Sequence, residues 1–302
     1  MNSVYHSGEL KVQTRSGDIE AAKNMGRTIQ PIIAHVFVDF IQSQPMVILG
    51  SVDGFGKVWT SILSNKPGFM KVIDEWTLQI NAVPDNEDPL HENLRECPEL
   101  GLLVIDFSTR RRLRLNGSVV IGTDGFSVRI RQVYSNCPRY IQSRECQLNK
   151  EIPFVPRVKR LATYLCEDLQ QWIRRADTFF LASFHPLGGA DASHRGGFPG
   201  FVQVIDARTL VWPDYNGNSM FNTLGNIIEN PHTGLLFIDF ENGGTLQLSG
   251  TAQIIWEWKR TDLFPGAERI VEFKVLMVRE TENATALRWR FLEYSPDNPW
   301  FC

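Results

Sequence analysis

Short apolar runs rich in β-branched and aromatic residues recur along the chain, separated by turn-forming sequences such as VDGFG at 52–56 and ENGG at 241–244. Runs of this kind predict strands. They lie at 46–52, 58–64, 69–73, 77–82, 100–107, 111–121 and 126–134, and again at 178–184, 190–194, 201–205, 209–212, 233–240, 245–256 and 270–279. Apolar residues at helical spacing predict helices at 32–43 and 158–174, directly before strands. The pattern predicts a mainly β protein, with antiparallel strands in small β-barrels and a few peripheral helices.

The second series of predicted elements repeats the first. PGFMKVIDEWTL at 67–78 and PGFVQVIDARTL at 199–210 are identical at eight of twelve positions, and GLLVIDF at 101–107 recurs as GLLFIDF at 234–240. Internal repeats of this length indicate two copies of one structural unit. We therefore predict two barrels in tandem, packed against each other as two subunits of a dimer would be, in an intrachain pseudo-dimer.

Length, charge and cysteine content narrow the class of protein. The 302 residues fit two domains, which we place at 1–150 and 151–302, linked by a segment over 135–157 that is too long and too charged for a core strand. The net charge of −3 gives no electrostatic footprint for nucleic acid or an anionic membrane. No leader or membrane-length apolar run is present, and the five cysteines form no C-x-x-C pair. We expect a cytoplasmic protein without a metal site.

Several motifs follow one another in a fixed order in the second half. They are SHRGGFPGFVQVID at 193–206, WPDYNGN at 212–218 and FNTLGNIIENPHTGLLFIDF at 221–240. In this order and spacing, the region from roughly 178 to 256 resembles the FMN-binding split-barrel proteins related to pyridoxamine 5'-phosphate oxidase. The first half resembles the same fold more loosely, and the whole chain is similar to a two-barrel, single-chain subgroup with YHSGE near its N-terminus, at 5–9.

The resemblance implies a flavin mononucleotide (FMN) site between two barrels, with residues from both. In the parent oxidase the flavin takes electrons from an amine and passes them to oxygen. Relatives use nicotinamide or other reductants, or bind haem or deazaflavin instead. The resemblance therefore supports a flavin more strongly than it supports any one reaction.

The SHRGG stretch at 193–197 has the chemistry that a flavin phosphate requires. A dianionic phosphate is bound by an arginine fork, hydroxyls and free backbone N–H groups, and glycines such as Gly196 let the backbone approach closely. On the predicted strand, successive side chains point to opposite sides, so Ser193 and Arg195 point to one side and His194 to the other. We predict that they contact the phosphate or ribityl chain. The alternative is a surface arginine beside a flexible loop.

The turn DYNGNSMFNT at 214–223 supplies further polar groups at the expected start of a helix, where unpaired N–H groups favour anions. The candidates for cofactor contact are Asp214, Asn218, Ser219, Asn222 and Thr223. An ordinary helix cap is the alternative. Many split-barrel flavoproteins place Arg or Lys in this turn, whereas Met220 stands there in this chain. That departure leaves Arg195 to carry more of the charge.

The two copies differ in complementary ways. The first copy has Ser61-Ile62-Leu63 where the second has Ser193-His194-Arg195, and the carboxylates in its VPDNEDPLHENL segment at 83–94 would repel a phosphate. Conversely, NCPRY at 136–140 follows only the first barrel and resembles a C-P-K-type segment of these families. A site built from the second barrel plus Arg139 would hold one flavin per chain. Alternatively, Arg139 is a solvated cation of the linker.

These observations leave two functional hypotheses. The first is an FMN-dependent oxidoreductase that acts on a small-molecule substrate or electron donor, with NAD(P)H as one candidate donor. His194 is a weak candidate for acid–base catalysis, because a lone histidine on a strand is more often structural. The second hypothesis is a non-catalytic protein that binds or senses flavin or haem. Pairing of two fused pseudo-dimers into a homodimer stays open.

Overall fold

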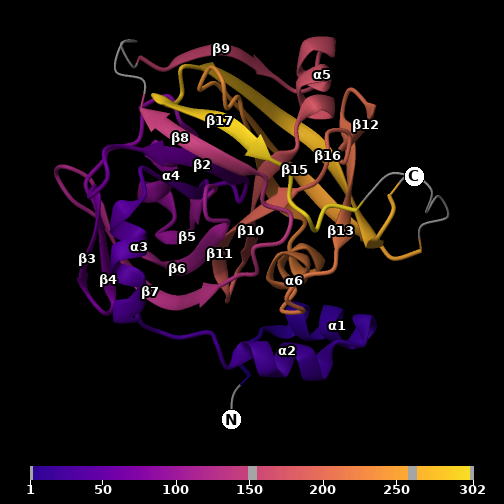
Figure 1. Cartoon of the computed structure of the whole chain (residues 1–302), viewed down its shortest axis with the longest axis horizontal. Coiled ribbons are helices and arrows are strands. Elements are labelled where there is room, and N and C mark those ends of the chain that lie inside the picture. Colours follow the sequence, from indigo (N-terminus) through magenta and orange to yellow (C-terminus); the bar gives the residue numbers. More distant parts are fainter. Residues whose placement is uncertain (1–2, 149–154, 258–263, 300–302) are drawn as a thin grey trace.

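The computed structural model describes residues 3–148, 155–257 and 264–299, and the first of two barrels lies in the N-terminal half (Figure 1). Its strands are β1 (Met46–Val52), β2 (Val58–Ser64), β3 (Met70–Asp74), β4 (Thr77–Ile80), β5 (Glu99–Asp106), β6 (Arg111–Ile121) and β7 (Phe126–Ser135). They are antiparallel in the order β2-β1-β5-β6-β7-β4-β3. Every strand predicted in this half is present, within two residues at each end.

The second barrel has the same strand order. Its strands are β10 (Thr178–His185), β11 (Gly189–Gly196), β12 (Gln203–Asp206), β13 (Thr209–Tyr215), β14 (His232–Ile238), β15 (Thr245–Ile255) and β16 (Ala267–Glu282). They follow the order β11-β10-β14-β15-β16-β13-β12, which matches the first sheet strand for strand. The predicted mainly β fold is confirmed. A duplication as the origin of the matching order stays a prediction, and the predicted boundary at residues 150 and 151 lies outside the described residues.

Glycines at equivalent positions of the two barrels allow their sheets to approach each other. A Cβ atom on Gly101 of β5 would lie 2.5 Å from the Cα of Asp191 in β11. At the equivalent place in the second copy, a Cβ on Gly234 of β14 would lie 2.7 Å from the Cα of Trp59 in β2. Real Cβ contacts are longer than this, so both positions require glycine. The two contacts relate the barrels as the two halves of a pseudo-dimer.

Three apolar cores hold the structure together. One core fills each barrel, and a third lies between the barrels. The third contains Ile48, Leu103 and Phe107 from the first barrel, and Phe180 and Leu236 from the second, all buried. Burial of apolar area at this interface stabilises the two barrels as one unit. The site described below lies beside this shared core.

Seven helical segments surround the barrels in the described part of the chain. They are α1 (Ser7–Ser16), α2 (Ile19–Gly26), the 3-10 turn η1 (His35–Phe37), α3 (Val38–Ser43), α4 (Pro89–Glu96), α5 (Glu167–Arg175) and α6 (Asn222–Glu229). Figure 1 shows α1 and α2 below α6, so the N-terminal helices lie against the second barrel. None of the described helices has the length and apolar character needed to cross a membrane.

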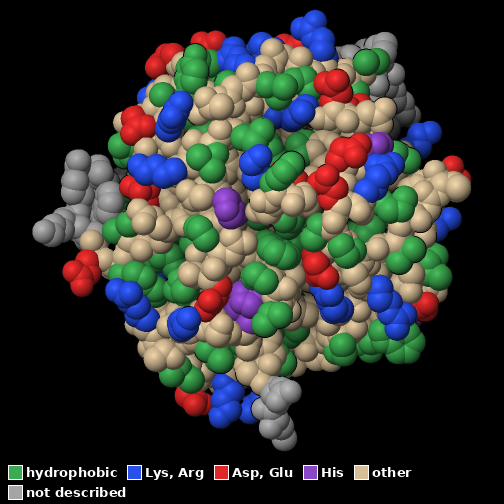
Figure 2. Space-filling model, turned by 180° about the vertical axis from the view of Figure 1, so that it is seen from behind, with side chains coloured by type: hydrophobic (Ala, Val, Ile, Leu, Met, Phe, Trp, Pro, Cys, Tyr) green, Lys and Arg blue, Asp and Glu red, His purple; other side chains and the backbone are tan. Residues whose placement is uncertain are grey.

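Basic and acidic side chains are interspersed on the face shown in Figure 2, without a large area of one sign. Most exposed apolar side chains are scattered, and the most exposed, Phe55 and Leu187, each lie in a hairpin turn. Isolated exposed apolar residues are normal on protein surfaces.

The predicted helices are shorter than their sequence patterns indicated. Only 38–43 of the segment 32–43 is α-helical, after the 3-10 turn. In the segment 158–174, the first residues instead form strand β9 (Arg157–Ala162), which pairs with β16. Helical spacing holds within α5, where Leu169 and Ile173 are buried and Trp172 packs against the same core. Upstream, partly buried and exposed residues alternate along β9, because a strand at a sheet edge turns every second side chain outward.

The predicted linker 135–157 also contains regular structure, which corrects the sequence interpretation. Residues Ser143–Leu148 form strand β8, which pairs with β17 (Leu287–Glu293) near the C-terminus. Its charged residues are accommodated by ion pairs: Arg144 donates two hydrogen bonds of 2.6 Å to Asp177, and Arg290 pairs with Glu145 at 2.6 Å. The charge of the segment did not exclude a strand, because β8 lies outside both barrels.

Candidate functional site

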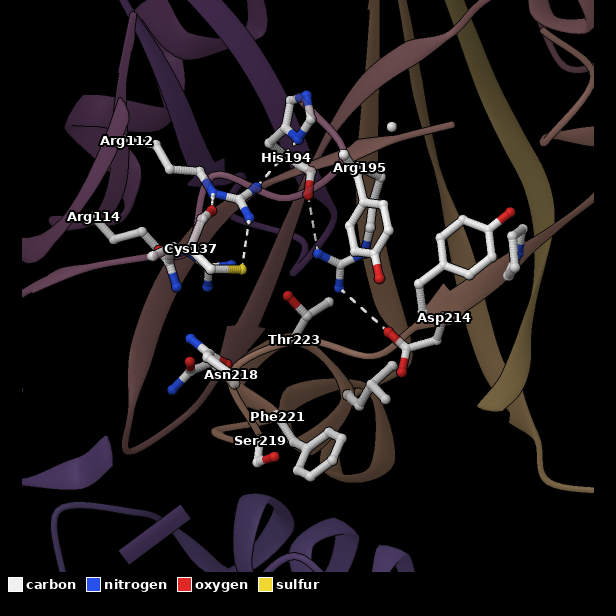
Figure 3. Close-up of a pocket in the computed structure, with 18 of the residues that line it drawn as sticks. Arg112, Arg114, Cys137, His194, Arg195, Asp214, Asn218, Ser219, Phe221 and Thr223 are labelled. Carbon is white, nitrogen blue, oxygen red and sulfur yellow. Dashed lines mark hydrogen bonds and ion pairs between the residues drawn. The ribbon is translucent and has the colours of Figure 1, made fainter. Parts of the chain in front are cut away.

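A cavity of about 100 Å³ lies where the first barrel meets the strand–turn–helix region of the second (Figure 3). We call it the arginine pocket. From the first barrel it is lined by Arg112, Arg114, Asn136, Cys137 and Tyr140; from the second, by His194, Arg195, Gly196, Phe201, Pro213, Asp214, Tyr215, Gly217, Asn218, Ser219, Phe221, Asn222, Thr223 and Leu224. Both barrels therefore contribute to one site, and most of the predicted site residues line it.

Arg195 reaches the pocket from the end of β11. Its Nη1 donates to Ser193 Oγ at 2.7 Å and to the His194 carbonyl oxygen at 3.1 Å, and its Nη2 lies 3.9 Å from Asp214 Oδ1 (Figure 3). Ser193 and Arg195 therefore lie on the same side of the strand, as predicted. Burial lowers the pKa of Arg195 and raises the pKa of Asp214. The ion pair is loose enough for Arg195 to take a second anionic partner.

Arg112, on β6 of the first barrel, is held by neutral groups. Its Nε donates to the Cys137 carbonyl oxygen at 3.0 Å, its Nη1 to His194 Nδ1 at 3.2 Å, and its Nη2 lies 3.8 Å from Cys137 Sγ. Burial lowers the pKa of Arg112 to about 10, so the guanidinium stays charged at neutral pH. It has no carboxylate partner among the residues that the structure describes. Arg112 is partly buried, and a partly desolvated cation without a counter-charge favours a bound anion.

Arg114, two residues further along β6, is paired. Its Nη1 donates to Asp191 Oδ2 at 2.8 Å, and Tyr134 donates to Asp191 Oδ1 at 3.3 Å. Its Nε has no hydrogen-bond partner in the described part of the chain. Among the described residues, the carboxylates within ion-pair distance of Arg112, Arg114 and Arg195 are Asp191, paired with Arg114, and Asp214, paired with Arg195. The local excess of positive charge is the chemistry of a phosphate site.

The turn before α6 closes the second-barrel side of the pocket. Asn218 Oδ1 accepts a hydrogen bond from the Met220 N–H at 3.1 Å, and Thr223 lies close to Ser193, with 3.4 Å between their hydroxyl oxygens. Ser219 and Phe221 have φ angles of 58° and 60°, which are left-handed conformations that non-glycine residues rarely adopt. Such backbone costs about 1–3 kcal/mol per residue and is concentrated at functional sites.

Met220, at the position where the family resemblance led us to expect Arg or Lys, points away from the pocket. Its side chain is fully buried with Tyr5, Ala22 and Tyr134, in contact with the N-terminal helices rather than the pocket. The cations instead come from Arg112 and Arg114 on the facing strand of the first barrel. The sequence analysis missed both arginines.

A signal for these two arginines is present in the repeat. Aligning LRLNG at 113–117 with LQLSG at 246–250 places Gln247 opposite Arg114 and Thr245 opposite Arg112. The arginines are thus among the positions where the copies differ, as Arg195 is. Differences between copies, rather than motifs alone, identify the charged side of the site.

His194 has a structural place in the pocket wall. It is buried, its Nδ1 faces Arg112, and its Nε2 has no hydrogen-bond partner in the described part of the chain. Burial and the neighbouring arginines hold its pKa well below the usual value, so the ring is neutral at physiological pH. The ring also packs against Phe180 at a centroid distance of 5.7 Å. These contacts favour the structural alternative over acid–base catalysis.

Of the predicted site residues Arg139 and Gly196, only Gly196 lines the pocket. Arg139 does not belong to the lining: its Nη1 donates to Asn216 Oδ1 at 2.8 Å, and its Nε lies 3.8 Å from Asp297. Gly196 does line the pocket, and a Cβ there would lie 2.0 Å from the Tyr140 carbonyl oxygen. Glycine at this position therefore lets the segment after β7 approach β11 and complete the pocket.

The equivalent place in the first copy has lost the positive charge. A cavity of about 270 Å³ there is lined by Leu63 and Thr245, at the positions of Arg195 and Arg112, and by Asp88. At the position of Arg114, Gln247 donates to Ser61 Oγ at 3.0 Å. None of the described residues lining this second cavity is Lys or Arg. The contrast in charge supports a single anion site per chain.

The second half of the chain matches a known protein family. Residues 165–290 match the family model of pyridoxamine 5'-phosphate oxidase. The matched region begins just before α5 and ends in β17, so it includes the second-barrel side of the arginine pocket. The match supports the predicted family resemblance for the second barrel. A comparison with curated proteins found no match.

Several solved structures are similar to part of the chain. HupZ from Group A Streptococcus is 15% identical, with 37% of this chain and 91% of that chain covered, at a TM-score of 0.32. A Clostridium acetobutylicum protein related to general stress protein 26, of the pyridoxinephosphate oxidase family, is 10% identical (40% and 89% covered, TM-score 0.28). A FAD-binding protein from Mesorhizobium loti is 14% identical (40% and 97% covered, TM-score 0.28). These values are too low to transfer a ligand or an activity.

Proposed function

We propose that the protein is an FMN-dependent oxidoreductase of the pyridoxamine 5'-phosphate oxidase-like group, with one FMN per chain between the two barrels. The observation that carries the proposal is Arg112, a partly buried guanidinium without a carboxylate partner in the described chain, beside Arg195 in a cavity that both barrels line. The family match of residues 165–290 supports a flavin-type cofactor.

The residues of the arginine pocket fit the phosphate end of FMN. Arg112 and Arg195 supply charged donors, and the hydroxyl of Thr223 and the amide of Asn222 supply neutral ones. A cavity of about 100 Å³ holds a phosphate group but is smaller than the roughly 300–1,000 Å³ of pockets that enclose a whole cofactor. The part of a flavin that this pocket encloses is therefore its phosphate.

The protein's own contribution is binding, orientation and charge. When bound, a flavin supplies two-electron redox chemistry that no side chain can perform. Arg112 and Arg195 would neutralise the phosphate, while Asp214 keeps Arg195 directed into the pocket at 3.9 Å. The neutral His194 ring holds Arg112 in place through its Nδ1 atom. An electron donor such as NAD(P)H and a small organic acceptor or oxygen complete the proposed reaction.

A protein that binds flavin without turning it over is the second candidate. It is favoured by His194, the weak candidate for acid–base catalysis, because this ring is buried, neutral and held by Arg112. Anaerobic addition of NADH or NADPH to the FMN-loaded protein separates the two candidates. Bleaching of the flavin absorption at a rate above that of free FMN supports the oxidoreductase, and no bleaching with any donor supports the binding protein.

Recognition of the phosphate predicts discrimination between FMN and riboflavin. Riboflavin presents the same ring without the charged group, so we expect it to bind at least about 100-fold more weakly, because two charge-assisted interactions are lost. Titrations of the protein with each compound, followed by flavin fluorescence, measure the ratio. Equal affinities for FMN and riboflavin would contradict a phosphate in the arginine pocket.

A further inference from the structure

The N-terminal helix contacts the turn that lines the arginine pocket. Glu9 Oε1 in α1 accepts a hydrogen bond from Asn222 Nδ2 at 2.5 Å, and Gln13 Nε2, one turn further along α1, donates to the Met220 carbonyl oxygen at 3.0 Å. Glu9 and Gln13 are both buried. Two side chains of one helix thus hold both ends of the three-residue stretch 220–222, beside the pocket.

Local sequence fixes α1 in this place. In the N-terminal cap, Gly8 N–H donates to His6 Nδ1 at 3.1 Å, and His6 N–H donates to Glu9 Oε2 at 2.8 Å. Gly8 and Gly225 allow close contact between α1 and α6, because a Cβ on Gly8 would lie 2.2 Å from the Gly225 carbonyl oxygen. His6 Nε2 adds a hydrogen bond of 2.8 Å to Asn226. The YHSGE segment is therefore a docking element for α6.

The turn requires support from outside itself. Ser219 and Phe221 adopt left-handed conformations, and the N-cap residue of α6, Phe221, makes no side-chain capping hydrogen bond. A strained turn persists only where its surroundings hold it. Glu9 and Gln13 supply two of the hydrogen bonds that reach this turn from outside it. Thr223 adds a hydrogen bond to Ser193, and the Arg269 guanidinium lies 4.8 Å from the centre of the Phe221 ring.

We propose that Glu9 and Gln13 are positioning residues of the arginine pocket, and that α1 holds the 218–223 turn in its anion-binding conformation. The inference rests on the proposed function in one respect, namely that the anion is the phosphate of a flavin. The N-terminal segment is then part of the binding site although it contacts no ligand. Loss of either side chain loosens the turn and weakens anion binding.

Glu9 also places a titratable group near the pocket. The charged or titratable side chains that face it are Tyr5, His6, Arg114 and Asp191. Burial raises the pKa of Glu9 to about 7, and burial lowers the pKa of His6 to about 4. Between pH 5.5 and 8.5, Glu9 is therefore the group of this set that changes charge. Its ionisation adds a negative charge beside Asp191 and Arg114, which opposes an anion in the pocket.

Three variants and a control test the positioning role without any flavin. Glu9→Ala and Gln13→Ala are expected to speed backbone hydrogen exchange in residues 219–223 about tenfold, because each removes one hydrogen bond to the turn, worth about 1.4 kcal/mol. Glu9→Gln keeps an acceptor for Asn222 and is expected to restore protection. Thr14→Ala in the same helix is the control, because the Thr14 side chain is exposed and donates its hydrogen bond to the Leu10 carbonyl oxygen. This variant is expected to leave exchange unchanged. Unchanged exchange in both alanine variants overturns the proposal.

Anion affinity gives a second, independent readout. Sulfate is the probe, since its charge is constant over this pH range whereas that of a phosphate monoester is not. In the native protein, sulfate affinity is expected to fall about threefold to tenfold as pH rises from 6 to 8, and Glu9→Gln is expected to flatten the profile. An identical pH profile in Glu9→Gln contradicts the role of the carboxyl group. If the protein binds neither sulfate nor FMN, the proposed function fails, while the exchange experiment still decides whether α1 supports the turn.

Discussion

Replacing Arg195 with alanine is expected to weaken FMN binding about 100-fold, which corresponds to about 2.7 kcal/mol. The phosphate loses a charged donor. Asp214 also loses its partner Arg195 at 3.9 Å and keeps Arg269, at 3.5 Å, as its remaining cation. The negative charge of Asp214 in the pocket is then less well compensated and opposes the phosphate. Arg195→Lys keeps the charge but not the planar fork, so an intermediate loss is expected. Fluorescence titration with FMN measures both variants.

Lys66 is the matched control for this prediction. It lies in the first copy and is exposed, and Lys66→Ala is expected to change FMN affinity less than twofold, because exposed charges contribute little. Thermal unfolding of each variant checks that the fold is retained. Unchanged affinity in Arg195→Ala would remove Arg195 from the site, and a large loss in Lys66→Ala would refute a single site in the second copy.

Truncation of Phe180 to alanine is expected to lower the free energy of unfolding by about 3–5 kcal/mol. Phe180 is fully buried in the core between the barrels, where its ring contacts Phe107 of the first barrel at a centroid distance of 6.3 Å. Alanine leaves a cavity on both sides of the interface. Urea unfolding followed by circular dichroism is expected to show one cooperative transition, shifted as a whole to lower urea.

Phe55 provides the control for this loss of stability. It is 87% exposed, and Phe55→Ala is expected to change the free energy of unfolding by less than about 1 kcal/mol. The contrary result is two separate unfolding transitions, with a shift in Phe180→Ala only for the transition of the second barrel. It would show that the barrels fold independently. That result would contradict a shared core as the link between them.

The strands of the two barrels were predictable because their signal is local. Each strand is a short apolar or alternating run bounded by a turn, and the internal repeat shows the same pattern twice. For example, the predicted strands 111–121 and 245–256 agree with β6 and β15 to within one residue. Strands β8, β9 and β17 were not predicted, because their partners are distant in the sequence and their charges are satisfied by ion pairs. β8 pairs with β17 outside the barrels, and β9 pairs with the barrel strand β16.

The sequence predicted the second-barrel side of the arginine pocket but not the two arginines of the first barrel. Arg195 and the 214–223 turn lie in a contiguous motif whose glycines and hydroxyls indicate phosphate chemistry directly. Arg112 and Arg114 lie in an ordinary strand sequence, and only the packing of β6 against β11 places them opposite that motif. The support from Glu9 required the structure for the same reason, since α1 and α6 are far apart in sequence.

The measurement that tests the central claim most directly is the cofactor content of the purified protein. An absorption spectrum with quantification of flavin per chain after denaturation, with and without prior incubation in FMN, gives the stoichiometry. The single arginine pocket predicts a flavin spectrum and about one FMN per chain. Two FMN per chain, or a colourless protein that takes up no added FMN, would contradict it.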